Sequence, residues 1–287
     1  MVNLMKYKIG FFILSILVIL PGLFFLVTSG LKLGIDFTGG ALLEYQFSKN
    51  PNIDDLKKYG IITNSGSNTY IIRTQVIDQN QLNDLRKSLT DKYGKIEVRR
   101  EENVGPVIGA ELKQKALTAI LLACLMIVLY ITYSFRKVPK PASSFRFGIS
   151  AIVALIHDVL VVVGIFAILG KFLNVEVDTL FVTALLTVIG FSVHDTIVVF
   201  DRVRENLPKH LGEKFERVAD ISITQTLARS LNTSLTVIFV LLALLLFGGE
   251  TIRWFVVALL VGIISGTYSS IFNATAVLCL WEEKLGH

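Results

Sequence analysis

Charged side chains are scarce in this sequence. Asp, Glu, Lys and Arg together make up 18% of the 287 residues, whereas a typical soluble domain has roughly 25%. Hydrophobic residues make up 53%, and the mean hydropathy is +0.63. This composition argues against an ordinary cytosolic enzyme.

Cysteine is also rare. The two cysteines, Cys124 and Cys279, both fall within long apolar stretches, and they have neither the spacing of a metal site nor that of a disulfide framework. We interpret them as small hydrophobic residues. The sequence therefore predicts no metal site, and it points to no cofactor.

The charges that are present are clustered, and six long stretches carry almost none. These stretches are residues 9–31, 116–135, 147–170, 179–200, 230–249 and 254–281. A transmembrane helix needs about 20 mainly apolar residues to cross about 30 Å of hydrocarbon. We therefore predict a polytopic α-helical membrane protein with six spans, five of them within residues 116–281. The first stretch is longer than the apolar core of a signal peptide, and no A-x-A-like site follows it, so we expect an uncleaved anchor.

Basic residues near the span ends indicate the orientation, because Lys and Arg accumulate in short cytoplasmic loops. Those predicted to be cytoplasmic are Lys6, Lys8, Arg136, Lys137, Lys140, Arg146, Arg202, Arg204, Lys209, Lys214 and Arg217. The loops on the other side each hold one cation, Lys171 and Arg253. We expect cytoplasmic termini at residues 1–8 and 282–287. This bias accounts for the net charge of +5, and the loops lack the basic face with stacking aromatics that binds nucleic acid.

The cytoplasmic loop 201–229 mixes charges with apolar residues at helical spacing. The apolar residues are Val203, Leu207, Leu211, Phe215 and Val218, and Pro208 interrupts the pattern. We predict that this loop is helical and lies at the membrane interface, in contact with lipid.

Residues 32–115, between the first two spans, form a polar segment that the orientation places outside the cytoplasm. Apolar and polar residues mix as in a strand at 41–47, β-branched and aromatic residues gather at 70–77, and alternation returns at 96–100. Helical patterns cover 52–59 and 79–93. We predict a small β-α-β-α-β domain that contacts or grips a partner, because it holds no Cys, no His and no nucleophile pairing.

Two carboxylates lie inside predicted spans, Asp158 in the third and Asp195 in the fourth. A carboxylate in a bilayer costs at least about 2.5–3.5 kcal/mol, so it usually faces the bundle interior and has a function. Desolvation and a nearby cation shift a carboxyl pKa in opposite directions, and a proton relay needs that balance. The alternatives are that Asp195 is a hydrogen-bonded packing residue and that Asp158 braces the fourth span.

The candidate cation is Arg229, at the predicted start of the fifth span. It begins a stripe with Asn232, Thr233 and Thr236, which share one helical face. A comparable stripe follows the fourth span through Thr183, Thr187, Gly190 and His194. Two polar faces on sequential antiparallel helices suggest a hydrated path through the bundle. In the alternative interpretation, Arg229 snorkels to the headgroups and serves topology alone.

A His-Asp dipeptide occurs in both the third and the fourth span, as His157-Asp158 and His194-Asp195. Such an echo is typical of internal repeats in transporters, and chance is the alternative. The histidines either relay protons or orient the neighbouring carboxylates, and we favour orientation. The G-x-G-D context of an intramembrane aspartyl protease is absent. In the sixth span, small residues recur at Gly262, Ser265, Gly266, Ser269 and Asn273, which we interpret as a packing face.

Several motifs together resemble one family. Residues 34–40 read Gly-Ile-Asp-Phe-Thr-Gly-Gly directly after the first span. Residues 104–109, 154–158, 193–206 and 229–234 also match in order and placement. This arrangement resembles the SecD/SecF family of protein-export membrane subunits, and the single small outer domain is similar to the SecF branch.

The resemblance implies one six-helix half of a bundle of the resistance-nodulation-division (RND) type in a prokaryotic cytoplasmic membrane, and no enzyme. Its implied partners are SecD, the SecY-E-G channel with other Sec accessory subunits, and a translocating preprotein. It implies use of the proton-motive force in late, ATP-independent export, with Asp195 as the coupling carboxylate and Arg229 as the membrane arginine. Gly34, Asp36, Gly39 and Gly40 of the signature would form a hinge, with Asp36 capping a turn.

The resulting hypothesis is that protonation of Asp195 weakens its pairing with Arg229, and that the repacked helices move the outer domain. Two other functions remain open at this stage. An RND-type exporter of small molecules would have larger outer domains, and a non-conducting assembly subunit would need no titrating Asp.

Overall fold

A computed structural model describes residues 3–66, 68–136, 138–139 and 142–284. The chain divides into a helical bundle, formed by residues 1–32 and 119–287, and an outer domain, Leu33–Thr118. The predicted loop cations Lys137 and Lys140, and the ends of the predicted segments 1–8 and 282–287, lie outside the described residues.

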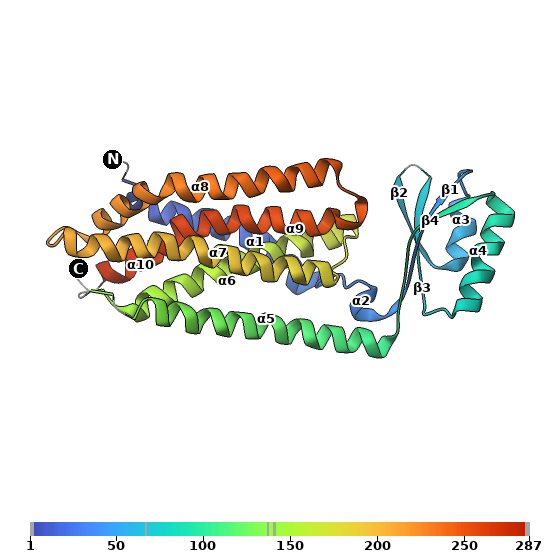
Figure 1. The fold of residues 1–287 in the computed structure, drawn as a ribbon, viewed down its shortest axis with the longest axis horizontal. Coiled ribbons are helices and arrows are strands. Elements are labelled where there is room, and N and C mark those ends of the chain that lie inside the picture. The colour runs from blue at the N-terminus through green and yellow to red at the C-terminus, as the bar shows by residue number, and fades with distance from the viewer. Residues whose placement is uncertain (1–2, 67, 137, 140–141, 285–287) are drawn as a thin grey trace. The chain divides into compact units, whose positions relative to one another are not determined.

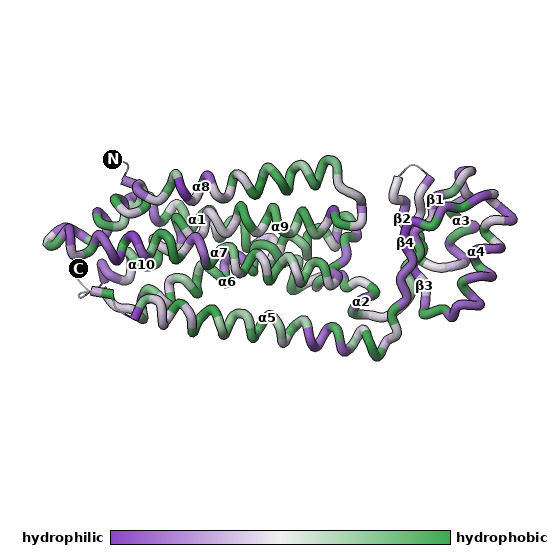
Figure 2. Tube along the Cα trace, viewed as in Figure 1, coloured by the Kyte–Doolittle hydropathy of each residue, from purple (hydrophilic) through white to green (hydrophobic). Residues whose placement is uncertain are grey.

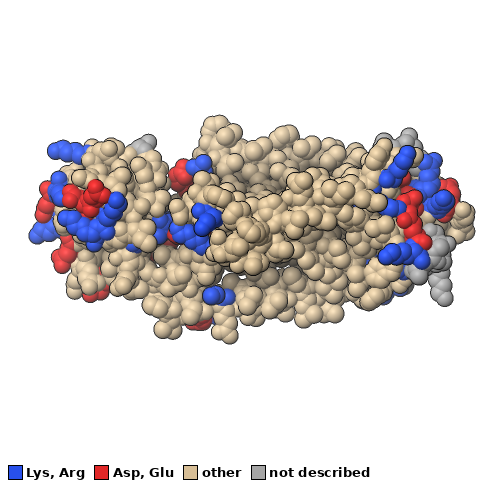
Figure 3. All heavy atoms as spheres, turned by 180° about the vertical axis from the view of Figure 1, so that it is seen from behind, with Lys and Arg blue, Asp and Glu red and all other residues tan. Residues whose placement is uncertain are grey.

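Six helices of the described chain are long and apolar enough to cross a membrane, and Figure 1 shows how they run. They are α1 (Lys8–Ser29), preceded by the 3-10 turn η1 (Met5–Tyr7), α5 (Pro106–Ser134), α6 (Ser144–Leu173), α7 (Thr179–Asn206), α8 (Phe215–Phe247) and α9 (Glu250–Tyr268), which continues through η4 (Ser269–Asn273) into α10 (Ala274–Glu283). The long helices are hydrophobic over most of their length (Figure 2). On the face drawn in Figure 3, a broad part of the bundle surface shows no Lys, Arg, Asp or Glu among the described residues. The prediction of six spans is confirmed.

Two helices extend beyond the predicted spans. The helix that contains the second span begins at Pro106, ahead of residue 116, and the helix that contains the fifth begins at Phe215, ahead of residue 230. The predicted interfacial helix 201–229 is therefore divided. Residues up to Asn206 extend α7, a 3-10 turn η3 (Leu207–Lys209) follows, and residues from Phe215 onward begin α8. The stretch from Phe215 to Phe247 contains no Gly or Pro, so nothing in it ends the helix.

Glycines set how closely the helices of the bundle approach. A Cβ added to Gly22 of α1 would lie 2.7 Å from the Cα of Gly164 in α6. A Cβ on Gly262 of α9 would lie 2.2 Å from the side chain of Val188 in α7. The backbones therefore meet where a side chain is missing, which is the use that membrane helices make of small residues.

The outer domain contains a four-stranded antiparallel sheet in the order β2-β3-β1-β4. Its elements are α2 (Ile35–Thr38), β1 (Gly40–Phe47), α3 (Ile53–Leu56), η2 (Lys57–Tyr59), β2 (Ile61–Gly66), β3 (Thr69–Thr74), α4 (Gln79–Tyr93) and β4 (Ile96–Val104). Leu43, Tyr45 and Phe47 of β1 form its core with Leu56 and Leu89 from the helices. The predicted helix 79–93 is confirmed to the residue. The sequence analysis missed β2, because this edge strand has no buried residue and shows no apolar alternation.

Candidate functional site

Asp158 lies in the middle part of α6 and is 0% exposed. Its carboxylate accepts hydrogen bonds from three hydroxyls: Ser192 of α7 at 2.5 Å, Ser265 of α9 at 2.9 Å and Ser269 of η4 at 2.6 Å. Hydroxyl donors stabilise a carboxylate that is otherwise costly to bury. Asp158 therefore joins three segments of the bundle.

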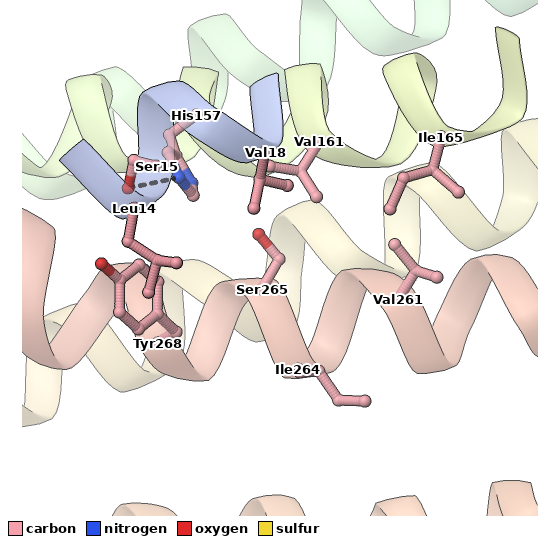
Figure 4. A pocket seen from close by; sticks show the side chains of 10 residues that line it. All are labelled: Leu14, Ser15, Val18, His157, Val161, Ile165, Val261, Ile264, Ser265 and Tyr268. Atoms are coloured by element: carbon pink, nitrogen blue, oxygen red, sulfur yellow. Dashed lines mark hydrogen bonds between the residues drawn. The ribbon is translucent and has the colours of Figure 1, made fainter. Parts of the chain in front are cut away.

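His157 contacts this carboxylate and extends its network to α1. The imidazole Nδ1 lies 3.0 Å from Asp158 Oδ1, and Nε2 lies 3.0 Å from the Ser15 hydroxyl. Asn273 donates its amide N–H to the same hydroxyl at 2.7 Å. Figure 4 shows His157 and Ser15 facing each other beside Tyr268, at the edge of a cavity of about 320 Å³ between α1, α6 and α9. The contacts of both ring nitrogens fit the orienting role that we favoured for His157.

Asp195 has much weaker contacts, although it is only 1% exposed. Ser234 of α8 is 3.5 Å from Oδ2, at the outer limit of a hydrogen bond. His194 Nδ1 is 3.6 Å from Oδ1, and the His194 side chain is 66% exposed. A buried carboxylate with two long contacts is held less firmly than one with three short ones, so Asp158 and Asp195 occupy different environments.

Arg229 lies well inside α8, and its side chain is exposed. Within the described part of the chain, no ion pair joins it to Asp195. The expected Asp195–Arg229 pairing is therefore not present in this structure. The reason is the direction of the helix faces: the side of α8 that meets Asp195 carries Ser234, and Arg229 lies on another side.

The two polar stripes also lie elsewhere than expected. Asn232, Thr233 and Thr236 are exposed with Arg229 on α8, and Thr183, Thr187, Gly190 and His194 are exposed on α7. The predicted hydrated path through the bundle is therefore not formed by these residues within this chain. Instead, they form polar outer faces on α7 and α8, the two helices that carry Asp195 and Ser234.

The small residues of the sixth span divide into two groups. Gly262 and Gly266 allow the close contact with α7, as predicted, and a Cβ on Gly266 would lie 3.1 Å from Ser192 Cβ. Ser265, Ser269 and Asn273 form hydrogen bonds with Asp158 and Ser15. The sequence analysis found these positions but interpreted them as packing alone. Ser15 and Ser192 carried no signal, because single serines are common in apolar helices.

The glycine signature lies in the outer domain and forms a close backbone contact with the start of α5. Gly39 and Gly40 have φ of 74° and 130°, which favour glycine. A Cβ on Gly39 would lie 2.9 Å from Pro106 Cα, and one on Gly109 would lie 3.0 Å from Gly39 N.

Gly34 is the N-terminal cap of α2 and has extended backbone, so its φ does not require glycine. Asp36 lies within the first turn of α2, and its role in capping a turn stays a prediction. Thr38 donates its hydroxyl to the Gly34 carbonyl at 3.0 Å.

Comparison with known proteins identifies the family. A family model described as the C-terminal part of the protein export membrane proteins SecD/SecF matches residues 84–284, and the SecD/SecF GG motif matches residues 24–51. Protein translocase subunit SecF of Thermobaculum terrenum is 49% identical, with 99% of this chain and 95% of that protein covered. The chain belongs to the SecF family of protein translocase subunits. The SecF subunit of Anaerolinea thermophila is 42% identical over the same shares of the two chains.

The SecF fold is also found in a longer solved protein. A crystal structure of SecDF from Thermus thermophilus, described as a translocon-associated membrane protein, matches with a TM-score of 0.86 and 30% identity. The match covers 98% of this chain but only 39% of SecDF. SecDF in a super-membrane-facing form matches with a TM-score of 0.70. The resemblance predicted from the motifs, together with the RND-type fold, is confirmed.

Proposed function

We propose that this SecF-family subunit couples the proton-motive force to late, ATP-independent steps of protein export. The observation that carries the proposal is Asp195, a carboxylate in a helix long and apolar enough to cross a membrane, which is 1% exposed and has two long contacts among the described residues. Few fixed donors compete for this carboxyl, so it can take up and release a proton as its surroundings change. Asp158, with three hydroxyl donors, is better suited to holding helices together.

We infer that the partner is a SecD bundle packed against the polar faces of α7 and α8. Arg229, His194 and Asn232 are exposed on helices that are long and apolar enough to cross a membrane, and polar groups of this kind are costly in contact with hydrocarbon. A second bundle would cover them and supply a counter-charge to Arg229. The 39% coverage of SecDF leaves length in that chain for a second half.

The proposed setting is the cytoplasmic membrane, beside the SecY-E-G channel. The basic loops favour cytoplasmic termini and an outer domain on the opposite side of the membrane. There the domain would meet a translocating preprotein. This proposed position fits the gripping role of the outer domain, which we inferred because its sequence shows no evident reactive centre.

The proposed cycle begins with proton uptake by Asp195. Neutralising the carboxyl weakens its interaction with the polar face that SecD covers, and the helices repack. α1 and α5 carry the change to the outer domain, because both connect to it along the chain. One charge moving across 100 mV supplies about 2.3 kcal/mol, enough to shift an equilibrium roughly fiftyfold.

The test is Asp195→Asn in the full chain, reconstituted with SecD and the channel in vesicles with an imposed proton gradient. Proton flux and gradient-driven export should be lost while the complex still assembles. Asp220→Asn is the matched control, because Asp220 is also buried but accepts the backbone N–H of Met5 at 2.9 Å, a bond that Asn retains. Unchanged flux and export in Asp195→Asn would disprove the proposal.

A further inference from the structure

The sixth span is interrupted by a π-helical turn, η4 (Ser269–Asn273). Its defining bond runs from the Ala274 N–H to the Ser269 carbonyl, five residues apart. Single π turns are rare and occur frequently at functional sites. The polar residues of this turn are buried, with Ser269 and Ser270 both 0% exposed and Asn273 4% exposed.

Each of these three side chains bonds to a different helix. Ser269 donates to Asp158 of α6, Ser270 donates to the Ser192 carbonyl of α7 at 2.8 Å, and Asn273 donates to Ser15 of α1. A hydroxyl in an apolar helix can instead bond the carbonyl four residues earlier in its own helix, and Thr183, Thr187 and Thr233 do so. The π turn therefore connects three helices.

Ser270 has a particular relationship to Asp195. Besides donating to the Ser192 carbonyl, it accepts a hydrogen bond from the Thr196 hydroxyl at 2.8 Å. One helical turn spans about 3.6 residues, so Ser192 and Thr196 bound the turn of α7 that carries Asp195. The hydroxyl of Ser192 also donates to Asp158. The turn bearing Asp195 is thus held at both ends by one side chain, which links it to the Asp158 network.

We propose that Ser270 is a positioning residue for Asp195, acting through Thr196 and Ser192. It fixes the rotation and height of this turn of α7, and with them the distance between the Asp195 carboxyl and Ser234 of α8. The inference rests on the proposed function, because it assigns Ser270 to the proton-dependent step.

The test compares Ser270→Ala and Thr196→Val in the full chain, assembled with SecD and the channel in vesicles. Each variant removes one partner of the 2.8 Å hydrogen bond. We expect gradient-driven export to slow by about fivefold, the effect of a typical net hydrogen bond, and the pH midpoint of export to move. The double variant should be no slower than the slower single variant, since both changes break the same link.

Ser150→Ala is the matched control. Ser150 lies on α6, is also 0% exposed, and its hydroxyl has no hydrogen-bond partner within the described part of the chain. Ser150→Ala removes a buried serine hydroxyl but breaks no hydrogen bond around Asp158 or Asp195. Export and its pH midpoint should therefore stay unchanged. The pH midpoint of export is informative because a titratable side chain of α7, His194, lies with its Nδ1 3.6 Å from Asp195 Oδ1. The residue of α8 that contacts Asp195 is Ser234, and α9 contacts Ser234 through the hydroxyl of Thr267.

Three results would overturn the inference. In the first, Ser270→Ala and Thr196→Val behave like Ser150→Ala. In the second, they slow export without moving the pH midpoint, and in the third, their effects add in full; either of these indicates a general packing role. If Ser270→Ala does not assemble, Thr196→Val decides, because Val preserves the branched shape. If the Ser270 inference fails while Asp195→Asn still abolishes export, the proposed function stands. If Asp195→Asn leaves proton flux and export unchanged, the proposed function itself is refuted.

Discussion

Gly22 of α1 and Gly164 of α6 meet backbone to backbone, so close that a Cβ on either glycine would lie within 3 Å of the Cα of the other. Ser15 and His157 form their hydrogen bond between the same two helices. The glycine contact therefore sets the separation at which α1 joins the Asp158 network.

Gly164→Ala should separate α1 from α6 and destabilise the bundle by about 1–3 kcal/mol, the usual cost of adding volume to a packed contact. Thermal unfolding in detergent measures the change. Gly10→Ala is the control, because Gly10 lies in α1, the helix that Gly164 contacts, and an added Cβ there meets nothing within 4 Å. Equal unfolding temperatures for the two variants would contradict this role for the glycine pair.

Gly109→Ala tests whether the glycine signature is a fixed contact or a hinge. The new Cβ would lie 3.0 Å from Gly39 N and 3.2 Å from the carbonyl carbon of Phe37. We expect the signature to separate from the start of α5, with faster amide hydrogen exchange over residues 35–40 and a loss of roughly 1–3 kcal/mol in local stability.

Gly105→Ala provides the comparison for this change. A Cβ on Gly105 meets nothing within 4 Å, and its φ is outside the left-handed region. Exchange over residues 35–40 should therefore match that of the unmodified chain. Equally slow exchange in Gly109→Ala would mean that the contact yields without cost, as a hinge would.

Glu101 of β4 predicts an acid-dependent weakening of the outer domain. Burial alone would raise the pKa of its carboxyl, but hydrogen bonds from Arg86 and Tyr45 outweigh burial and lower the pKa below the ordinary value of 4.5. Because the pKa is lower in the folded state, the stabilisation is fully present above about pH 4.5 and disappears as the pH falls through the folded value.

Glu101→Gln should therefore lower the free energy of unfolding of the outer domain at neutral pH by roughly 1–2 kcal/mol, a value reduced for the partial exposure of Arg86. The difference from the unmodified chain should shrink in acid. Hydrogen exchange of β1 and β4, corrected for intrinsic pH dependence, measures it. Glu97→Gln on the same strand is the control, since Glu97 is 61% exposed. A difference that stays constant with pH would refute the assignment.

Local sequence patterns were sufficient for the spans, because hydropathy is a property of consecutive residues. The same holds for α4, whose apolar spacing and Asp78–Gln81 capping box both lie within one short segment. The two buried carboxylates were also found from sequence, since a charge inside an apolar run is conspicuous. β2 was missed because an edge strand is stabilised by its neighbour β3 and not by its own pattern.

The partners of those carboxylates were decided only by the tertiary structure. Ser265 and Ser269 reach Asp158 across 107 and 111 residues of sequence, and the rotation of α8 places Ser234, not Arg229, against Asp195. A sequence of apolar helices determines that spans form, because each helix satisfies its own backbone hydrogen bonds. It leaves open how each helix is rotated about its axis, because that rotation depends on close contacts such as Gly22 with Gly164 and on hydrogen bonds that exist only after the helices have packed.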